Sequence, residues 1–158
     1  MVRRLFLVLA ALFFAHYASA EIVTQKFNWS PVNGVQRLHF DWNDIAISEI
    51  HFDLGGTIKP LKTSTARAVV RVDNNSARDQ EVGVALALFD EDGTMLAAGS
   101  GGIKLGDLDR GERDTFTVRF PYVYRNMKKA KYFLLTVEAQ PTGKWHYQPK
   151  AKPTEPAR

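Results

Sequence analysis

Short segments of alternating apolar and polar residues run through most of the chain, and this period of two is typical of β-strands. The segments are residues 35–42, 45–54, 66–72, 82–89, 94–98, 103–105, 116–120 and 133–137. Turn-forming residues separate them, beginning with Asn33-Gly34, which suits the two positive-φ positions of a type I′ hairpin turn. Seven or eight short strands with regular turn signals predict an all-β, antiparallel β-sandwich.

Two segments depart from simple alternation. In residues 82–89 both alternating sets are apolar: Val84, Leu86 and Leu88 form one, and Ala85, Ala87 and Phe89 form the other. A strand of this kind is predicted to be central and covered on both faces. In residues 121–131 the apolar residues Val123, Met127 and Ala130 fall at helical spacing. A short helix or crossover turn is therefore expected there.

The first twenty residues have the organisation of a secretory signal peptide. Arg3 and Arg4 precede an unbroken apolar run at 5–15, and residues 18–20 read Ala-Ser-Ala. Small residues at this spacing predict a signal-peptide helix cleaved between Ala20 and Glu21. The alternative, an uncleaved membrane anchor, is disfavoured because so short a run cannot cross about 30 Å of hydrocarbon as a helix. We therefore expect an exported bacterial protein, periplasmic or secreted, with no membrane span after cleavage.

Residues 21–140 are predicted to form the one folded domain, and residues 141–158 a tail. The domain holds 15 basic and 16 acidic side chains, so the net charge of +4 arises at the two ends of the chain. A near-neutral domain lacks the clustered basic face that nucleic acid requires. The absence of cysteine excludes thiol catalysis and thiolate metal sites. The tail contains four prolines and is expected to be flexible, although Trp145 and Tyr147 would be able to pack back onto the domain.

Three motifs follow one another in the middle of the chain. Residues 70–76 read Val-Arg-Val-Asp-Asn-Asn-Ser, residues 86–90 read Leu-Ala-Leu-Phe-Asp ahead of Gly93, and residues 110–112 read Arg-Gly-Glu ahead of Phe116 and Val118. Over residues 66–138 this order resembles the bacterial FxLYD-type domains. Leu86 and Phe89 stand where the family has Phe and Tyr, whereas Leu88 and Asp90 match it. The resemblance implies an immunoglobulin-like or fibronectin-III-like sandwich, and it implies no reaction.

Two copies of His-Phe-Asp, at 39–41 and 51–53, are candidates for a metal site. Within each copy His and Asp share one face of a strand because they are two residues apart. If the two strands pair, the set His39, Asp41, His51 and Asp53 would converge and offer zinc nitrogen and oxygen ligands. The alternative places both phenylalanines in the core and leaves His and Asp as ordinary solvent-side neighbours. We expect the alternative, with no metal and no other cofactor.

Residues 90–93, Asp-Glu-Asp-Gly, raise a calcium hypothesis with Asp107 or Asp109 as further ligands. In an EF-hand loop the glycine is sixth and acidic ligands are first and twelfth. Here those two positions are Leu88 and Gly99, so a hairpin turn is the favoured interpretation. Residues 99–102, Gly-Ser-Gly-Gly, match neither a nucleophile elbow nor a phosphate-binding loop. They predict a flexible loop or a β-bulge.

No group of residues in the sequence points to catalysis. We therefore predict an exported, non-catalytic module that binds a protein or a component of the cell envelope. One alternative is a structural module stabilised by metal, either at the His/Asp strands or at the acidic turn. Another is a hydrolytic enzyme that uses His39, His51, His146 or paired carboxylates. The partner and the oligomeric state stay open at this level.

Overall fold

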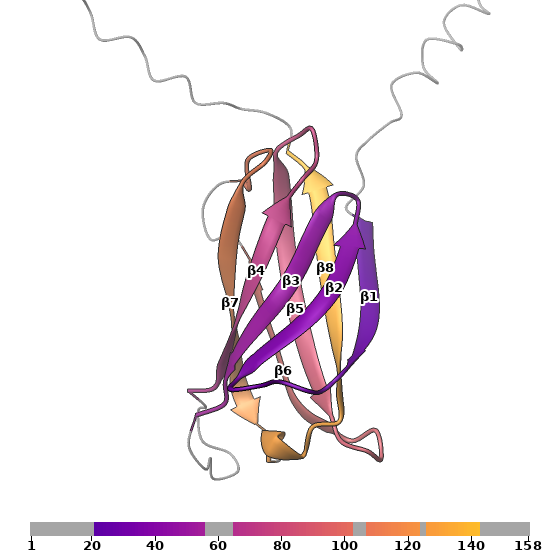
Figure 1. The fold of residues 1–158 in the computed structure, drawn as a ribbon, viewed down its shortest axis with the longest axis vertical. Coiled ribbons are helices and arrows are strands. Elements are labelled where there is room, and N and C mark those ends of the chain that lie inside the picture. Colours follow the sequence, from indigo (N-terminus) through magenta and orange to yellow (C-terminus); the bar gives the residue numbers. More distant parts are fainter. Residues whose placement is uncertain (1–20, 56–64, 103–106, 124–125, 143–158) are drawn as a thin grey trace, which may run out of the picture.

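A computed structural model describes residues 21–55, 65–102, 107–123 and 126–142, which form eight strands (Figure 1). The strands are β1 (Glu21–Asn28), β2 (Val35–Trp42), β3 (Ile45–Asp53), β4 (Arg67–Asn74), β5 (Gln80–Phe89), β6 (Met95–Gly102), β7 (Arg113–Val123) and β8 (Tyr132–Pro141). All paired strands are antiparallel, which confirms the predicted all-β class. The expected signal helix, the segment 103–105 and residues 143–158 lie outside the described residues. No helix in the described ranges is long and apolar enough to cross a membrane.

The eight strands form one continuous sheet in the order β1-β8-β5-β6-β7-β4-β3-β2. The sheet curls until its two edge strands, β1 and β2, come together, so that it resembles a nearly closed barrel (Figure 1). At one end of this seam the Asn43 side chain donates a hydrogen bond to the Glu21 carboxylate. At the other end the backbone N–H of Ser30 donates to Oε1 of Gln36 at 2.8 Å. All eight strands therefore belong to one curled sheet, and their pairing does not divide them into the two separate sheets of a sandwich.

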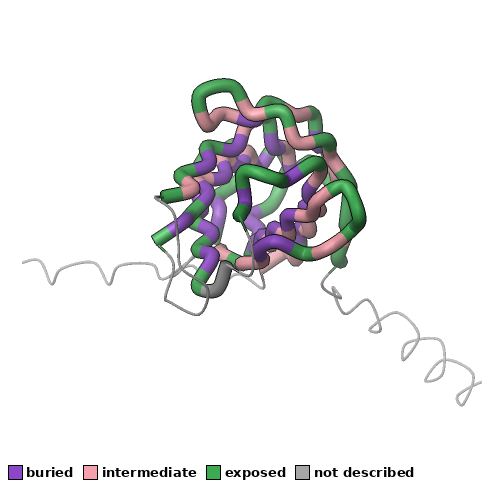
Figure 2. Tube along the Cα trace, turned by 90° about the horizontal axis from the view of Figure 1, so that it is seen from below, coloured by how far each residue is buried: buried purple, intermediate pink, exposed green. Residues whose placement is uncertain are grey.

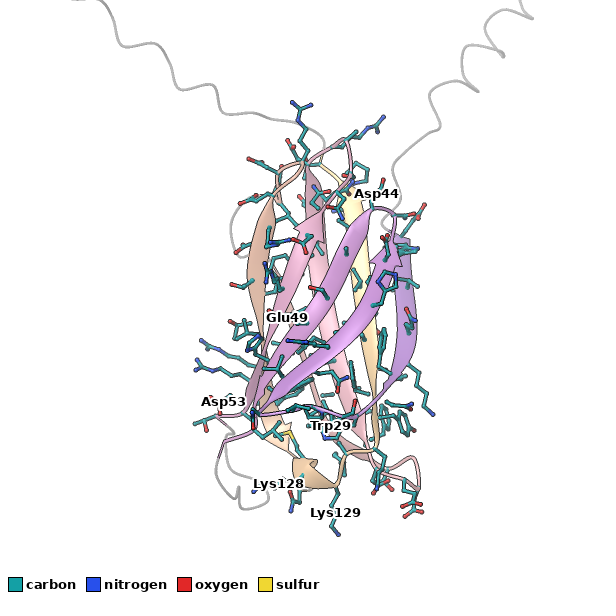
Figure 3. The ribbon with its side chains drawn as sticks, in the orientation of Figure 1. Trp29, Asp44, Glu49, Asp53, Lys128 and Lys129 are labelled. Atoms are coloured by element: carbon teal, nitrogen blue, oxygen red, sulfur yellow. The ribbon has the colours of Figure 1, made fainter. Side chains whose placement is uncertain are left out.

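The interior is filled by alternate residues of β2 to β8, and Figure 2 shows buried and exposed positions alternating around the wall. The largest fully buried side chains are Phe40, Ile45, Ile47, Ile50, Leu86, Leu88, Leu96, Leu108, Phe116, Phe120, Phe133 and Leu135. Trp29, just after β1, seals one end of the core because its ring centroid lies 4.6 Å from that of Phe52 and 6.3 Å from that of Phe133. Figure 3 shows Trp29 and Asp44 near opposite ends of the barrel.

The turn at Asn43-Asp44 sets the register of β2 against β3. Both residues have positive φ, 51° and 62°, as a two-residue type I′ turn requires. Trp42 is consequently opposite Ile45. Asn33 and Gly34 also have positive φ, and Val32 and Val35 exchange two backbone hydrogen bonds of 2.9 Å across them. That turn does not join β1 to β2 as a paired hairpin, because β1 pairs with β8.

Two elements differ from the sequence expectation. β1 carries no clear alternation because it is an edge strand, and only Val23 and Phe27 are half-buried against the core. β7 continues through Pro121 to Val123, where a helix or crossover was expected to begin. The helical part is a single 3-10 turn, Met127–Lys129, which begins where the Asn126 side chain accepts a hydrogen bond from the Lys128 N–H at 2.9 Å.

Candidate functional site

The outer surface of the barrel divides into a charged half and a half that is uncharged along its middle, with Lys26, Glu81 and Glu138 at its margins; they are here called the charged half and the uncharged half. The outward positions of β2, β3, β4 and β7 carry the ionisable residues Arg37, His39, Asp41, Glu49, His51, Asp53, Arg67, Arg71, Asp73, Arg113 and Arg119. The outward positions along the middle of β5, β6 and β8 carry Gly83, Ala85, Ala87, Ala98, Ser100, Leu134 and Thr136. Single exposed apolar residues are ordinary, but a contiguous uncharged face is a feature of interaction surfaces. The uncharged half is therefore the candidate site.

A groove of about 550 Å³ hollows this uncharged half. Its lining comes from β5 and β6 in the middle, β8 on one side and β7 on the other: Ala85, Leu86, Ala87, Ala98, Gly99, Ser100, Arg119, Pro121, Leu134 and Thr136. A second hollow of about 300 Å³ extends along the same strands to Ile22, Gly83 and Glu138. Because Ala85, Ser100 and Thr136 line both hollows, the two are parts of one groove, here called the outer groove.

The outer groove exists because β5 and β6 present the smallest side chains of the sheet between longer ones on β7 and β8. Val84, Leu86 and Leu88 of β5 are buried, as the sequence predicts. The other apolar set, Ala85, Ala87 and Phe89, is only half-buried. The prediction that β5 is covered on both faces is therefore wrong for the described residues, which cover its inner face alone.

An aromatic pair lies immediately beyond the groove on the same face. Phe89 and Tyr132 are directly opposite each other, and their rings stack with centroids 5.1 Å apart. The Lys26 ammonium lies 3.7 Å from the centroid of the Tyr132 ring, which is a cation–π contact. Sequence analysis missed this cluster because it did not predict β1, the strand that supplies Lys26.

The groove is suited to binding an extended, mostly apolar segment. Among the described residues, the charged ones that line it are Arg119 in one hollow and Glu138 in the other. Hydroxyl groups come from Ser100, which is directly opposite Arg119 in the β6–β7 register, and from Thr136. The lining thus offers apolar contacts with a few polar groups at fixed positions, as ligand-binding clefts do. Sequence analysis identified the apolar face of β5 but did not predict the groove walls on β7 and β8. The order of strands in the sheet decides which strands lie beside β5, and a single segment of sequence does not contain that order.

The four predicted metal candidates do not converge. β2 and β3 do pair, but the register places His51 opposite Val35 and Asp41 opposite Ala46. His39 is therefore about four residues, or roughly 13 Å, from the position opposite His51. Asp53 instead lies 3.4 Å from Arg67, at the end of β3 seen in Figure 3. Among the described residues no group of three or more His, Asp or Glu side chains is placed to hold a metal ion.

His51 makes a different contact, with Glu49 on its own strand. Its Nε2–H donates to Glu49 Oε1 at 3.3 Å, and Arg71 Nη1 donates to the same oxygen at 3.4 Å. The hydrogen bond from His51, followed by the one from Arg71, lowers the pKa of Glu49 below its ordinary value of 4.5. Figure 3 shows Glu49 on the outer side of β3.

We expect His51→Ala to raise the pKa of Glu49 back toward 4.5, because the largest cause of the shift is removed. Since the folded-state pKa is lowered, this carboxylate stabilises the fold above pH 4.5, and its contribution is lost as the pH falls through the folded-state pKa. A carboxyl titration by NMR measures the shift. His39→Ala is the control, because His39 is exposed on β2 and should leave the pKa of Glu49 unchanged. An unmoved Glu49 titration in His51→Ala would contradict the assignment.

The acidic segment 90–93 forms a turn that uses its first carboxylate internally. Oδ1 of Asp90 accepts hydrogen bonds from the N–H groups of Asp92 at 3.1 Å and Thr94 at 2.8 Å. Gly93 has φ of +79°, a conformation that favours glycine. A calcium ion bound at Asp90 would therefore have to compete with two backbone hydrogen bonds for Oδ1.

We predict that Asp90→Ala lowers the free energy of unfolding by about 1–2 kcal/mol, because two backbone donors lose their acceptor. Asp90→Asn should retain most of the stability, since its side-chain oxygen can accept the same bonds. Chemical denaturation in calcium and in chelator measures both variants. A cost of Asp90→Ala that appears only in calcium would support the metal hypothesis instead.

Residues 99–102 lie within β6 and are not a loop, so that part of the expectation is wrong. The pairing of β6 with β7 does shift register between Ala98 and Ser100, but two β7 residues, Phe120 and Pro121, oppose Gly99 alone, so the extra residue of this bulge belongs to β7. A Cβ atom on Gly99 would lie 2.1 Å from the carbonyl oxygen of Arg119. The glycines therefore permit the close approach of two backbones, which is a structural role.

Comparisons of the chain with protein-family profiles, with curated proteins and with solved structures found no match.

Proposed function

We propose that the protein is an exported, non-catalytic β-sandwich module that binds a protein or a cell-envelope component through the outer groove. The observation that carries this proposal is the asymmetry of the barrel: one half of its outer surface is charged, and the other is uncharged along its middle, where it is hollowed between Arg119 and Glu138. The free energy falls when a partner removes such an apolar concave surface from water.

We further propose that the fold is of the immunoglobulin-like or fibronectin-III-like type and related to the FxLYD-type domains. One layer would be β2-β3-β4-β7 and the other β6-β5-β8-β1, joined where β6 pairs with β7. In the resembling segment Leu86 and Leu88 are buried, Asp90 receives the backbone hydrogen bonds of the following turn, and Gly93 takes positive φ. These placements support the proposal because they put an apolar strand directly ahead of a tight turn, which is how the sequence motif reads.

A capture experiment with groove variants tests the binding function. The chain from Glu21 to Arg158 is immobilised, exposed to cell-envelope extract, and compared with Ala87→Arg and Ser48→Arg. Ala87 lines the groove, whereas Ser48 is exposed on β3, four strands away from β5 in the sheet, so the two variants add the same side chain to opposite surfaces. Loss of a dominant partner from Ala87→Arg alone supports the proposal. A partner retained by Ala87→Arg and lost from Ser48→Arg would place binding on the charged half and refute the groove.

Export is tested by the mature N-terminus. When residues 1–158 are produced in a bacterium, we expect mass spectrometry of the exported protein to find Glu21 as the first residue. Ala20→Leu should block processing, because signal peptidase requires a small residue at that position. Retention of residues 1–20 in a membrane-bound chain would favour the anchor alternative.

A further inference from the structure

The end of the outer groove that lies nearest to the C-terminal end of β8 is an apolar hollow without a cover among the described residues. Its lining includes Ile22, Gly83, Ala85, Thr136 and Glu138, and the Ile22 side chain on the edge strand is 64% exposed. We propose that the chain's own C-terminal segment, residues 143–158, docks here and places the aromatic residues Trp145 and Tyr147 in this part of the groove. The domain would then cover the second apolar face of β5 with its own tail.

The length of chain beyond β8 is sufficient for this contact. β8 ends at Pro141, and Thr142 still bonds through its N–H to the Asp79 carbonyl at 3.1 Å, so the last described residue is fixed. From Thr142 back along β8, Glu138 and Thr136 lie about 13 and 20 Å away at 3.3 Å per residue. Trp145 and Tyr147 follow Thr142 by three and five residues, which span up to about 10 and 17 Å when extended. If the segment reverses direction directly after Thr142, Tyr147 reaches past Glu138, and Trp145, whose backbone stops about one residue short of Glu138, reaches the rim of the hollow with its side chain.

Charge complementarity supports the same occupant. The segment 143–158 carries four Lys or Arg residues and one Glu. Glu138 lines the hollow. Glu81 lies two residues before the lining residue Gly83 on β5, and the Gln140 side chain donates a hydrogen bond to its carboxylate. An aromatic side chain offers a large apolar area at a low entropic cost, which suits a shallow groove floored by alanine and glycine. Basic residues next to the aromatics would meet the two carboxylates.

The proposal concerns the free protein and does not depend on the partner of the proposed function. Trp145 is one of three tryptophans, and the others, Trp29 and Trp42, are half-buried against the core. The difference in fluorescence between the 21–158 chain and its Trp145→Phe variant isolates the emission of Trp145. A free peptide of residues 141–158 provides the reference for an undocked tail.

We expect Trp145 in the whole chain to emit at shorter wavelength than in the peptide and to be quenched severalfold less by acrylamide. Ala85→Arg, which fills the groove, should return both values to those of the peptide, while Ser48→Arg, exposed on β3 in the charged half, should not. Glu138→Lys is the second groove variant, at an exposed rim position that does not affect the core. Emission and quenching equal to those of the peptide in the whole chain would overturn the proposal. So would a shielded Trp145 that neither groove variant exposes.

Discussion

Gly99→Ala is expected to lower the free energy of unfolding by about 3 kcal/mol or more, the largest effect we predict for a one-carbon change in this protein. The added Cβ would lie 2.1 Å from the Arg119 carbonyl oxygen and 3.2 Å from a ring carbon of Phe120. The obstacle at the closer distance is backbone of the neighbouring strand, so it cannot move away as a side chain would. β6 and β7 would have to separate, and with them the wall of the outer groove. For a domain of this size, thermal unfolding should shift down by about 10 °C.

Gly83→Ala is the matched control for this prediction. Gly83 lies on β5 and has ordinary negative φ, and a Cβ there meets Glu138 only at 3.8 Å, an ordinary contact distance. We expect a change within about 1 kcal/mol, in either direction, because alanine loses less backbone entropy than glycine on folding. Equal effects of the two substitutions would show that the β6–β7 approach does not constrain the fold.

Asn74→Ala should lower the free energy of unfolding by about 3 kcal/mol, because a fully buried amide links the loop after β4 to the segment before β7. Its Nδ2 donates to the carbonyl oxygens of Arg78 at 2.9 Å, Leu108 at 2.8 Å and Asp109 at 3.1 Å, and its Oδ1 accepts from the Ser76 N–H at 3.0 Å. Each buried polar group left without its partner costs about 1–3 kcal/mol, although some of these carbonyls keep a second donor. Urea denaturation measures the loss.

Two further variants test the cause of that loss. Asn75→Ala removes the exposed neighbouring amide and should change stability by no more than about 0.5 kcal/mol. Asn74→Asp keeps the shape but points a carboxylate at three carbonyl oxygens, so it should cost more than Asn74→Ala at neutral pH. That excess should diminish at low pH, where a protonated carboxyl can donate again. If Asn74→Asp is as stable as the wild type, the hydrogen bonds of Nδ2 do not determine stability.

Only the part of the candidate site that depends on a single segment could be predicted from the sequence. The double apolar character of residues 82–89 identified the strand that floors the groove, because it is a property of one segment. It could not show that the outer set stays uncovered, since that depends on which strands flank β5 and how long their side chains are. Leu134, Arg119 and Pro121 lie far from β5 in the sequence and reach it only through the order of strands in the sheet.

The metal hypothesis also depended on a relation between two strands, their register, that the sequence of each strand does not specify. The alternation within the two His-Phe-Asp repeats correctly predicted that Phe40 and Phe52 lie in the core and that the adjacent His and Asp residues lie outside it. Convergence needed one particular register, and the turn at Asn43-Asp44 imposes another. A slip of a few residues along a strand separates side chains by many ångströms, so a constellation across two strands cannot be derived from the spacing within each.

The sequence by itself determined the all-β class, most strand positions, the inward faces and the turn at residues 90–93, because alternation and turn chemistry act over a few residues. Only the tertiary structure decided the pairing of β1 with β8, the seam with β2, the separation of charged and uncharged halves, and the groove. Those features arise from contacts between residues as far apart as Glu21 and Ala139. Such pairings are selected by the fit of the whole sheet around its core, and no local pattern contains that information.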